Sequence, residues 1–465
     1  MKQKSGFSGQ IGFVLAAAGS AVGVGNLWRF PYLAAKDGGG LFLIIYLVLV
    51  LTVGFTLLTT DIAIGRKTGK SAIYAYESMR KKWKFLGVIT FIVPVIIMTY
   101  YAVIGGWILK YIDIYILGSG KEAVADNCFT NFITSPSSVW YGIIFMLLTA
   151  IIVYNGVEKG IERVSKFIMP VLLVMVVGIA IFSLTLKTTL DDGTVRTGLQ
   201  GLKVYLTPDM SGITVQKFLQ VSLDAMSQLF FSLSVSMGIM ITYGSYVKKD
   251  VDLNKAVSQI EIMDTGVAFL AGVMIIPAVF VFSGLDGMSA GPGLMFVSLP
   301  KVFYCMGVVG RIIGILFFVL AGFAALTSCI SVLESITANC MELFHTERKK
   351  TTRVLSVIYL IATAVIALGY SVFYVEVALP NGSTGQLLDI MDYISNSFMM
   401  PFISLLSAIL IGWIMKPSWI AEEMELNGKK FKRKKLYNVM MRYIMPVIMM
   451  ILFLQSTGVL NLIMK

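Results

Sequence analysis

At residues 21–31 the first long apolar stretch of the chain contains the run Ala-Val-Gly-Val-Gly-Asn-Leu-Trp-Arg-Phe-Pro. Gly23 and Gly25 lower helix propensity and let backbone approach a ligand, while Asn26 adds an oxygen and Arg29 a charge. A helix broken at membrane depth is tolerated where its backbone lines a cavity. The run therefore predicts a binding site. The alternative, close helix packing through small residues, requires neither Asn26 nor Arg29.

The composition places this break in a membrane protein. Of the 465 residues, 57% are hydrophobic and only 14% are charged, and apolar runs repeatedly reach spanning length. We expect an all-α polytopic membrane protein with eleven transmembrane helices. The expected spans are residues 12–35, 41–65, 86–116, 138–155, 165–187, 217–246, 256–284, 306–343, 354–373, 387–415 and 436–462.

The start of the chain resembles a cleavable signal peptide only superficially. Lys2 and Lys4 precede an apolar stretch that ends in Ala16-Ala17-Ala18. The apolar part is too short for a signal core, and the segment continues into the glycine-rich run. We expect this segment to be retained.

The distribution of basic residues predicts the orientation. With a cytoplasmic N-terminus, the inner segments hold 27 of the 38 Lys and Arg residues, as the positive-inside rule requires. The odd number of helices then places Lys465 outside, in a cell-membrane protein. The formal net charge of +12 requires no nucleic acid, because the basic run 429–435 has no interleaved aromatic residues and is better suited to anionic lipid.

No enzymatic apparatus is visible in the sequence. Cys305, Cys329 and Cys340 lie in or near the eighth span and Cys128 in an outer loop, so no disulfide framework is implied. His345 is the only histidine, and no catalytic triad, metal-binding or phosphate-binding motif is present. Transport or gating is therefore the expected function.

A second interruption occurs in the sixth span. Ser232, Ser234, Ser236 and Gly238 interrupt an apolar helix with hydroxyl groups and a glycine. The serines could simply bond back to the preceding helical turn. However, spans one and six each open a set of five helices, and matching breaks in two halves are typical of inverted repeats around a midplane site.

We therefore expect one transporter domain over residues 1–465 that contains two repeats. The first repeat covers residues 12–187 and the second covers residues 217–415, with an additional helix at 436–462. Several separated motifs now indicate a family.

Residues 25–31 read Gly-Asn-Leu-Trp-Arg-Phe-Pro, residues 230–234 Phe-Phe-Ser-Leu-Ser, residues 241–246 Ile-Thr-Tyr-Gly-Ser-Tyr and residues 326–328 Leu-Thr-Ser. In this order they resemble the neurotransmitter:sodium symporter family, over residues 4–415. The resemblance implies the five-plus-five fold of the bacterial leucine transporter, with sodium-coupled amino-acid import by alternating access.

The resemblance also implies two sodium sites, built from the oxygen ligands that a hard cation prefers. The first would comprise the Ala21 carbonyl, Asn26, Ser232 and Asp264. The second would comprise the carbonyls of Gly19, Val22 and Ala324 and the hydroxyls of Thr327 and Ser328. For the two hydroxyls the alternative is bonding back to their own helix.

Asp264 departs from the pattern of the bacterial leucine transporter, which has Asn there, and chloride-dependent animal members also lack this acid. A carboxylate within a span is expensive unless it has a partner, so sodium is the expected partner. The alternative is a protonated Asp264 bonded across a helix interface. Because the acid can supply the negative charge that chloride supplies elsewhere, we expect no chloride requirement.

Gly23 indicates the substrate class. Monoamine-transporting members place Asp there, to pair with an amine, whereas Val24 and Gly25 point N–H groups at a carboxylate, with the Tyr101 hydroxyl as a further donor. An amino acid is therefore expected. The expected substrate-binding residues are Ala21, Gly23, Val24, Gly25, Ile97, Tyr101, Phe231, Ser232, Ser234, Met237, Ser328 and Val332.

The apolar lining favours a hydrophobic or aromatic side chain such as that of tyrosine, tryptophan or leucine. Met237 stands where the leucine transporter has Phe, and methionine adapts to irregular shapes. The alternative is that Met237 is an ordinary core residue.

By resemblance, two gates close around the site. Arg29 and Asp392 would form the outer charge pair, with Tyr101 and Phe231 as an aromatic lid. The inner gate would comprise Lys4, Phe7, Tyr246, Glu334 and Glu342. Gly160 and Pro170, with nine residues between them, match a pattern in which helix five unwinds to admit water to the second sodium.

Two other functions stay open. One is a sodium-independent amino-acid exchanger of the same fold, and the other is a sensor or channel that never completes a transport cycle. Nothing in the sequence predicts the oligomeric state.

Overall fold

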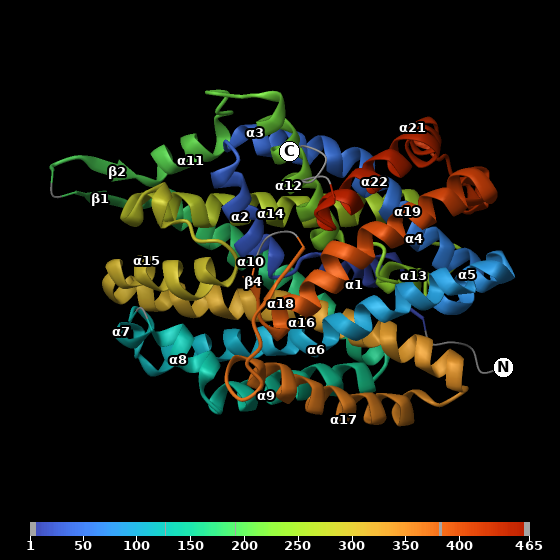
Figure 1. Ribbon diagram of the computed structural model, residues 1–465, viewed down its shortest axis with the longest axis horizontal. Helices are drawn as coiled ribbons and strands as arrows, with labels where there is room; N and C mark the ends of the chain where they lie inside the picture. The colour runs from blue at the N-terminus through green and yellow to red at the C-terminus, as the bar shows by residue number, and fades with distance from the viewer. Residues whose placement is uncertain (1–5, 126, 191, 381–383, 460–465) are drawn as a thin grey trace.

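The computed structural model describes residues 6–125, 127–190, 192–380 and 384–459 (Figure 1). Most helices run along the longest axis of the molecule, with the β1–β2 hairpin at one end and α5 at the other (Figure 1). The prediction of an all-helical polytopic membrane protein with broken first and sixth helices is confirmed by this arrangement.

The first half of the chain forms the helices α1 (Gln10–Ala21), α2 (Gly25–Lys36), α3 (Gly40–Leu49), η1 (Val50–Gly54), α4 (Phe55–Thr68), α5 (Ala72–Met79), η2 (Lys81–Trp83), α6 (Lys84–Leu117), α7 (Gly120–Ala123), α8 (Cys128–Thr134), α9 (Ser137–Tyr154), η3 (Val157–Glu162) and α10 (Arg163–Thr185). An antiparallel hairpin follows, in which β1 (Lys187–Thr189) pairs with β2 (Val195–Thr197).

The second half forms α11 (Gly198–Leu206), α12 (Val215–Leu233), α13 (Ile239–Ser245), α14 (Leu253–Ser283), η4 (Leu285–Gly287), η5 (Leu294–Ser298), α15 (Leu299–Cys305), α16 (Gly307–Phe344), α17 (Arg348–Ala367) and η6 (Leu368–Tyr370). A short hairpin of β3 (Val377–Ala378) and β4 (Thr384–Gly385) follows. The chain ends with α18 (Leu387–Asp392), η7 (Tyr393–Met399), α19 (Met400–Ile409), η8 (Leu410–Ile414), α20 (Ser418–Met424), η9 (Leu426–Gly428), α21 (Lys434–Val439), η10 (Met440–Ile444) and α22 (Met445–Ser456).

Within the described ranges, nine helical segments are long and apolar enough to cross a membrane, and the bent pair α1–α2 raises the number to ten. The sixth expected span, residues 217–246, is not one helix but the separate helices α12 and α13. The fifth span begins at Val157 rather than at residue 165, because the charged turn η3 is helical and continues into α10.

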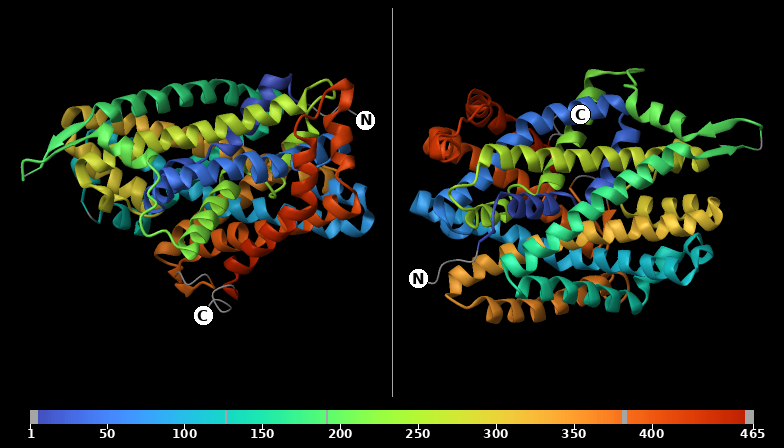
Figure 2. Two further views of the ribbon diagram at one scale, coloured as in Figure 1. Left: turned by 90° about the horizontal axis from the view of Figure 1, so that it is seen from above. Right: turned by 180° about the vertical axis from the view of Figure 1, so that it is seen from behind.

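The first break separates α1 from α2 by a 55° bend. Val22 is extended after α1, with a ψ of 94°, and the helix resumes at Gly25. The broken helices lie inside the bundle, where α1 packs against α10, α14 and α16, and α13 packs against α4 and α16 (Figure 2). Their free backbone groups therefore face protein rather than lipid.

The second break is held in an unusual backbone conformation. Ser234, Ser236 and Gly238 have φ values of 52°, 62° and 76°, in the left-handed region that side chains rarely adopt. The backbone N–H of Ser236 donates to the Asp61 carboxylate at 2.8 Å, and its hydroxyl pairs with that of Ser404 at 2.5 Å. Residues from three other helices therefore hold this segment open, as the hydroxyl of Ser234 also reaches α1.

Candidate binding site between the broken helices

A cavity of about 30 Å³ lies between the two breaks. Nine of its lining residues are those expected from the sequence: Ala21, Gly23, Ile97, Tyr101, Phe231, Ser234, Met237, Ser328 and Val332. Four more were not expected: Ser20, Tyr100, Ile239 and Asn396. Met237 is thus a wall of the cavity as well as a buried core residue.

Hydroxyl groups from two helices converge on the end of α1. Ser234 donates to the Ser20 carbonyl at 2.9 Å, and Ser328 of α16 donates to the same oxygen at 3.2 Å. These serines bind across the bundle rather than back to their own helices, in contrast to the alternative considered from the sequence. The hydroxyl oxygen of Ser20 is itself buried and has no hydrogen-bond partner among the described residues.

Glycine is required at two positions beside the cavity. A Cβ on Gly23 would lie 3.1 Å from the Tyr101 hydroxyl and 3.2 Å from that of Ser328. A Cβ on Gly25 would overlap the ring of Phe231. The break therefore admits these polar groups and this ring only because the backbone carries no side chain there. The N–H of Val24 donates to the Tyr101 hydroxyl at 3.5 Å.

Asp264 lies at the centre of a fully buried polar cluster. The Asn26 amide donates to it at 2.9 Å, and the Ser232 hydroxyl lies 2.8 and 2.9 Å from its two oxygens. The side-chain oxygen of Asn26 accepts from the Gly23 N–H at 3.2 Å. Three of the four expected ligands of the first sodium therefore meet directly, and the fourth, Ala21, lines the adjacent cavity.

The expected ligands of the second sodium lie where α1 packs on α16. A Cβ on Gly19 would be 3.3 Å from Thr327. The Thr327 hydroxyl donates to the carbonyls of Phe323 at 3.0 Å and Ala324 at 3.1 Å, which is the bonding to its own helix considered as the alternative. Val22 caps α1 through its N–H and the Ala18 carbonyl.

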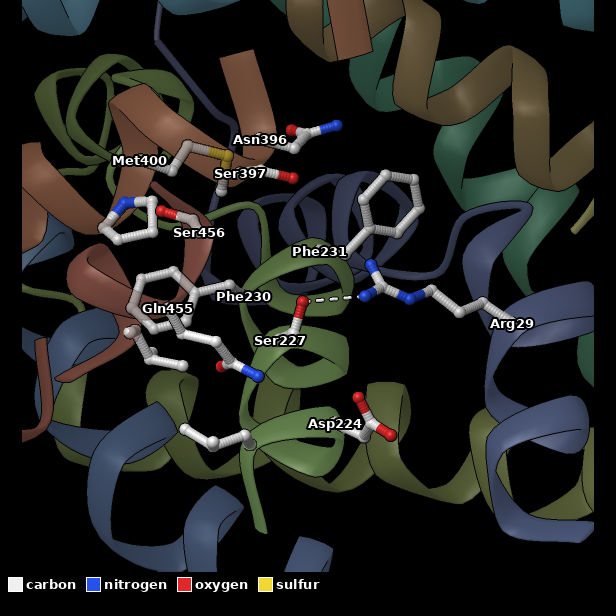
Figure 3. Close-up of a pocket in the computed structure, with 13 residues that line it drawn as sticks. Arg29, Asp224, Ser227, Phe230, Phe231, Asn396, Ser397, Met400, Gln455 and Ser456 are labelled. Carbon is white, nitrogen blue, oxygen red and sulfur yellow. Dashed lines mark hydrogen bonds between the residues drawn. The ribbon is translucent and has the colours of Figure 1, made fainter. Parts of the chain in front are cut away.

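A second hollow of about 190 Å³, which we call the outer hollow, adjoins the first (Figure 3). Phe231 and Asn396 line both cavities, so the Phe231 ring separates them. In Figure 3, Arg29 reaches across the outer hollow to Ser227, to which it donates at 2.7 Å, and its guanidinium lies 5.9 Å from the Phe231 ring centre. Asn396 also donates to Asp392 at 2.6 Å.

The expected outer charge pair is not formed in this structure. Within the residues that the structure describes, no ion pair joins Arg29 to Asp392. Each has a nearer partner, since Asp392 accepts from Tyr100 at 2.9 Å and from Asn396. The sequence could have indicated Asn396, because it follows Asp392 by one helical turn and shares its face.

Residues expected at the inner gate take part in an aromatic and ionic network. Phe7 packs edge-on against Tyr246 with ring centres 6.2 Å apart, and the Tyr246 hydroxyl donates to Glu334 at 2.7 Å. Arg348 binds the same carboxylate with two nitrogens at 2.5 and 2.8 Å. Arg348 was not expected as a site residue, although a basic residue at the start of an apolar span is a visible signal.

Two residues of the expected inner gate remain, Lys4 and Glu342. Lys4 lies outside the described residues. Glu342 accepts from the backbone N–H and hydroxyl of Ser71 at 3.0 and 2.5 Å. In helix five, Gly160 lies in η3 and Pro170 within α10, so the two expected positions flank the junction of these segments.

The fold and site define a class of protein: a multi-pass membrane protein whose two broken helices enclose a buried polar cluster beside a small cavity. The chain belongs to the sodium:neurotransmitter symporter family, whose model matches residues 4–136 and 128–463. It is therefore a sodium-dependent transporter and not an enzyme.

Individual relatives agree with this assignment. The chain is 34% identical over 463 residues to the uncharacterized sodium-dependent transporter YhdH of Bacillus subtilis, covering 98% of each chain. It is 25% identical to the human sodium- and chloride-dependent GABA transporter 2, covering 89% of this chain and 73% of that one. Its structure is similar to that of MhsT in complex with L-phenylalanine, with a TM-score of 0.84, 36% identity, and coverage of 98% of this chain and 100% of the other.

Proposed function

We propose that the chain is a sodium-coupled symporter that imports hydrophobic or aromatic amino acids without requiring chloride. The observation that carries this proposal is the direct meeting of Asn26, Ser232 and Asp264 beside a cavity between two helix breaks. These groups offer the oxygen ligands that a hard monovalent cation prefers, next to backbone that the break leaves available.

In the proposed arrangement the substrate carboxylate lies beside Gly23 and Val24. The N-terminal end of α2 starts there and directs the positive end of its helix dipole towards this position. The Tyr101 hydroxyl accepts from Val24, which leaves its own proton free for the carboxylate. Because Gly23 carries no acidic group, an amine without a carboxylate would find no counterion at this position.

The substrate side chain would occupy the apolar part of the same cavity. Ile97, Met237 and Val332 supply aliphatic walls, and Phe231 closes the outward side. Tyrosine, tryptophan, leucine and phenylalanine are the proposed candidates. The similarity to a structure titled as a complex with L-phenylalanine supports a side chain of this kind.

The proposed independence from chloride rests on Asp264. This fully buried carboxylate has only neutral hydrogen-bond donors around it in the described structure, namely Asn26 and Ser232. Sodium is the cation that would balance its charge. An additional anion at this location would place two negative charges close together.

The two sodium ions, the two gates and the paired repeats complete the proposed mechanism. The second sodium would bind between α1 and α16, at Gly19, Val22, Ala324, Thr327 and Ser328. Sodium would stabilise the outward-open state, the substrate would complete the first sodium site, and the repeats 12–187 and 217–415 would then alternate around the fixed centre. Coupling arises because each ligand supplies part of the site of the other.

The proposal is tested by transport into liposomes that contain the purified protein. Labelled tyrosine, tryptophan, leucine and phenylalanine are offered with an inward sodium gradient, with potassium in place of sodium, and with gluconate in place of chloride. Accumulation is expected with sodium in either anion. Uptake indifferent to sodium would instead identify an exchanger, binding without accumulation would identify a sensor, and clear stimulation by chloride would contradict the role of Asp264.

A further inference from the structure

A long apolar groove lies on the surface of the bundle, away from the candidate binding site. It has a volume of about 690 Å³ and runs between α3–η1 and α14. Figure 2 shows these helices side by side when the molecule is seen from behind. Its lining includes well exposed apolar side chains: Ile44, Leu47, Leu51, Ile262 and Phe269.

The length of the groove corresponds to one leaflet of a bilayer. Its lining residues on α14 extend from Ser258 to Phe269. Eleven helical steps at 1.5 Å each give about 17 Å. Half of the hydrocarbon core of a bilayer is about 15 Å, so an extended acyl chain in one leaflet would fit this length.

One end of the groove opens into a basic hollow. This basic hollow has a volume of about 500 Å³ and shares Ser258, Ile262 and Arg433 with the groove. It is also lined by Lys255, Lys430 and Lys432. The three lysines are exposed. Among the described residues, none of their ammonium groups has an ion-pair partner.

The acidic residues nearby already have partners. Glu261 binds Arg433 at 2.7 Å, and the Arg433 guanidinium lies 3.6 Å from the Phe55 ring centre. Asp252 lies 4.0 Å from the ammonium group of Lys429. The hollow therefore presents a neutral floor and three uncompensated positive charges at the mouth of an apolar groove.

We propose that this groove and hollow bind one anionic phospholipid of the leaflet that faces the N-terminal side. Its phosphate lies among Lys255, Lys430 and Lys432, and one acyl chain lies along α14 towards Phe269. The basic run 429–435, which no part of the transport mechanism uses, thereby acquires a ligand. Charge complementarity selects an anionic headgroup over a zwitterionic one.

Two sets of variants test separately how the lipid headgroup and the acyl chain contribute to binding. Lys255→Gln, Lys430→Gln and Lys432→Gln together remove the phosphate contacts, and Lys349→Gln with Lys350→Gln is a control on another basic segment. Gly266→Leu fills the groove, where a Cβ on Gly266 meets nothing within 4 Å. Gly178→Leu is the matched control, because it is equally unobstructed but lies on α10 outside the groove.

Binding is measured by native mass spectrometry of the delipidated full-length protein, with phosphatidylglycerol, phosphatidylcholine and glycerol phosphate as probes. We expect phosphatidylglycerol to bind more tightly than phosphatidylcholine, with an affinity that falls as salt rises. Each lysine is worth about fivefold, so the triple variant should lose about 100-fold. Gly266→Leu should lose at least tenfold, and both controls should bind as the parent does.

Four results would overturn the proposal. Equal binding of both phospholipids, or an unchanged affinity in the lysine variant, would show that the site does not recognise an anionic headgroup. Full affinity for glycerol phosphate would reveal a site for a soluble anion rather than for a lipid. Unchanged binding in Gly266→Leu would show that the acyl chain does not lie in the groove. None of these readouts depends on transport, so they are independent of the proposed function.

Discussion

Replacing Asp264 by asparagine removes one negative charge from the buried cluster with almost no change of shape. In the parent, Asn26 and Ser232 donate to the carboxylate at distances of 2.8 to 2.9 Å. A sodium ion about 4 Å from a unit negative charge gains about 4 kcal/mol at an effective dielectric constant of 20. The amide oxygen of asparagine can still bind sodium and so retains part of this interaction energy. We therefore expect a net loss of about 2–3 kcal/mol, which corresponds to a 30- to 150-fold loss of sodium affinity.

Substrate affinity should fall together with sodium affinity. In the proposed site the substrate carboxylate completes the coordination of the first sodium, so the coupling between the two ligands is reciprocal. At subsaturating sodium, Asp264→Asn should therefore weaken substrate binding by a similar factor, and higher sodium should partly restore it. Asp264→Ala should be worse, because the Asn26 and Ser232 donors would be left buried without a partner at about 1–3 kcal/mol each.

The assay is equilibrium binding of labelled substrate to purified protein over a sodium titration, with potassium holding the ionic strength constant. Asp250→Asn is the control, since it makes the same change on an exposed inner loop. Thermal unfolding without substrate checks that each variant is folded. The reasoning is refuted if Asp264→Asn loses substrate affinity while the sodium titration midpoint stays unchanged, or if it shifts that midpoint without affecting substrate.

Four further predictions concern the cavity and the gates. Gly23→Ala should weaken substrate binding about tenfold, because its Cβ would lie 3.1 Å from the Tyr101 hydroxyl, and binding competition by free amino acids measures this. Tyr101→Phe should raise KM about tenfold by removing one hydrogen bond to a carboxylate, whereas Tyr141→Phe should leave transport kinetics unchanged. Arg29→Lys should alter the rate of substrate binding, measured by stopped flow, more than the substrate affinity, because the guanidinium hydrogen bond to Ser227 is lost. Glu334→Gln should lower the hydrogen-exchange protection of the inner segment more than tenfold, since it leaves the paired Arg348 charge uncompensated.

The sequence predicted both helix breaks because their composition contradicts a continuous apolar helix. Glycines with Asn26 mark the first break, and alternating serines mark the second. The long apolar runs likewise predicted most spans to within a few residues. The fifth span was wrong at its start, because the charged residues Glu158, Lys159 and Glu162 have the composition of a loop yet lie in the helical turn η3.

Contacts between distant segments were accessible mainly through the family resemblance. Asn26 and Asp264 are 238 positions apart, and no local pattern pairs them. Asp61, which accepts from the backbone of Ser236, is likewise 175 positions from its partner. Arg348 lies only 14 positions from Glu334, but the two residues lie on different helices, and no local pattern pairs them. For the outer pair, the sequence shows the two charges but not the neutral groups Ser227 and Tyr100, which bind Arg29 and Asp392 in this structure.

The left-handed serines of the second break have a further consequence. Glycine would adopt this backbone freely, whereas serine pays of order 1–2 kcal/mol per residue. The interruption therefore persists only while Ser20, Asp61 and Ser404 hold it from three neighbouring helices. A rearrangement that breaks one of these contacts would allow the strained backbone beside the cavity to relax. The second break is thus a strained backbone segment whose conformation depends on contacts from three other helices.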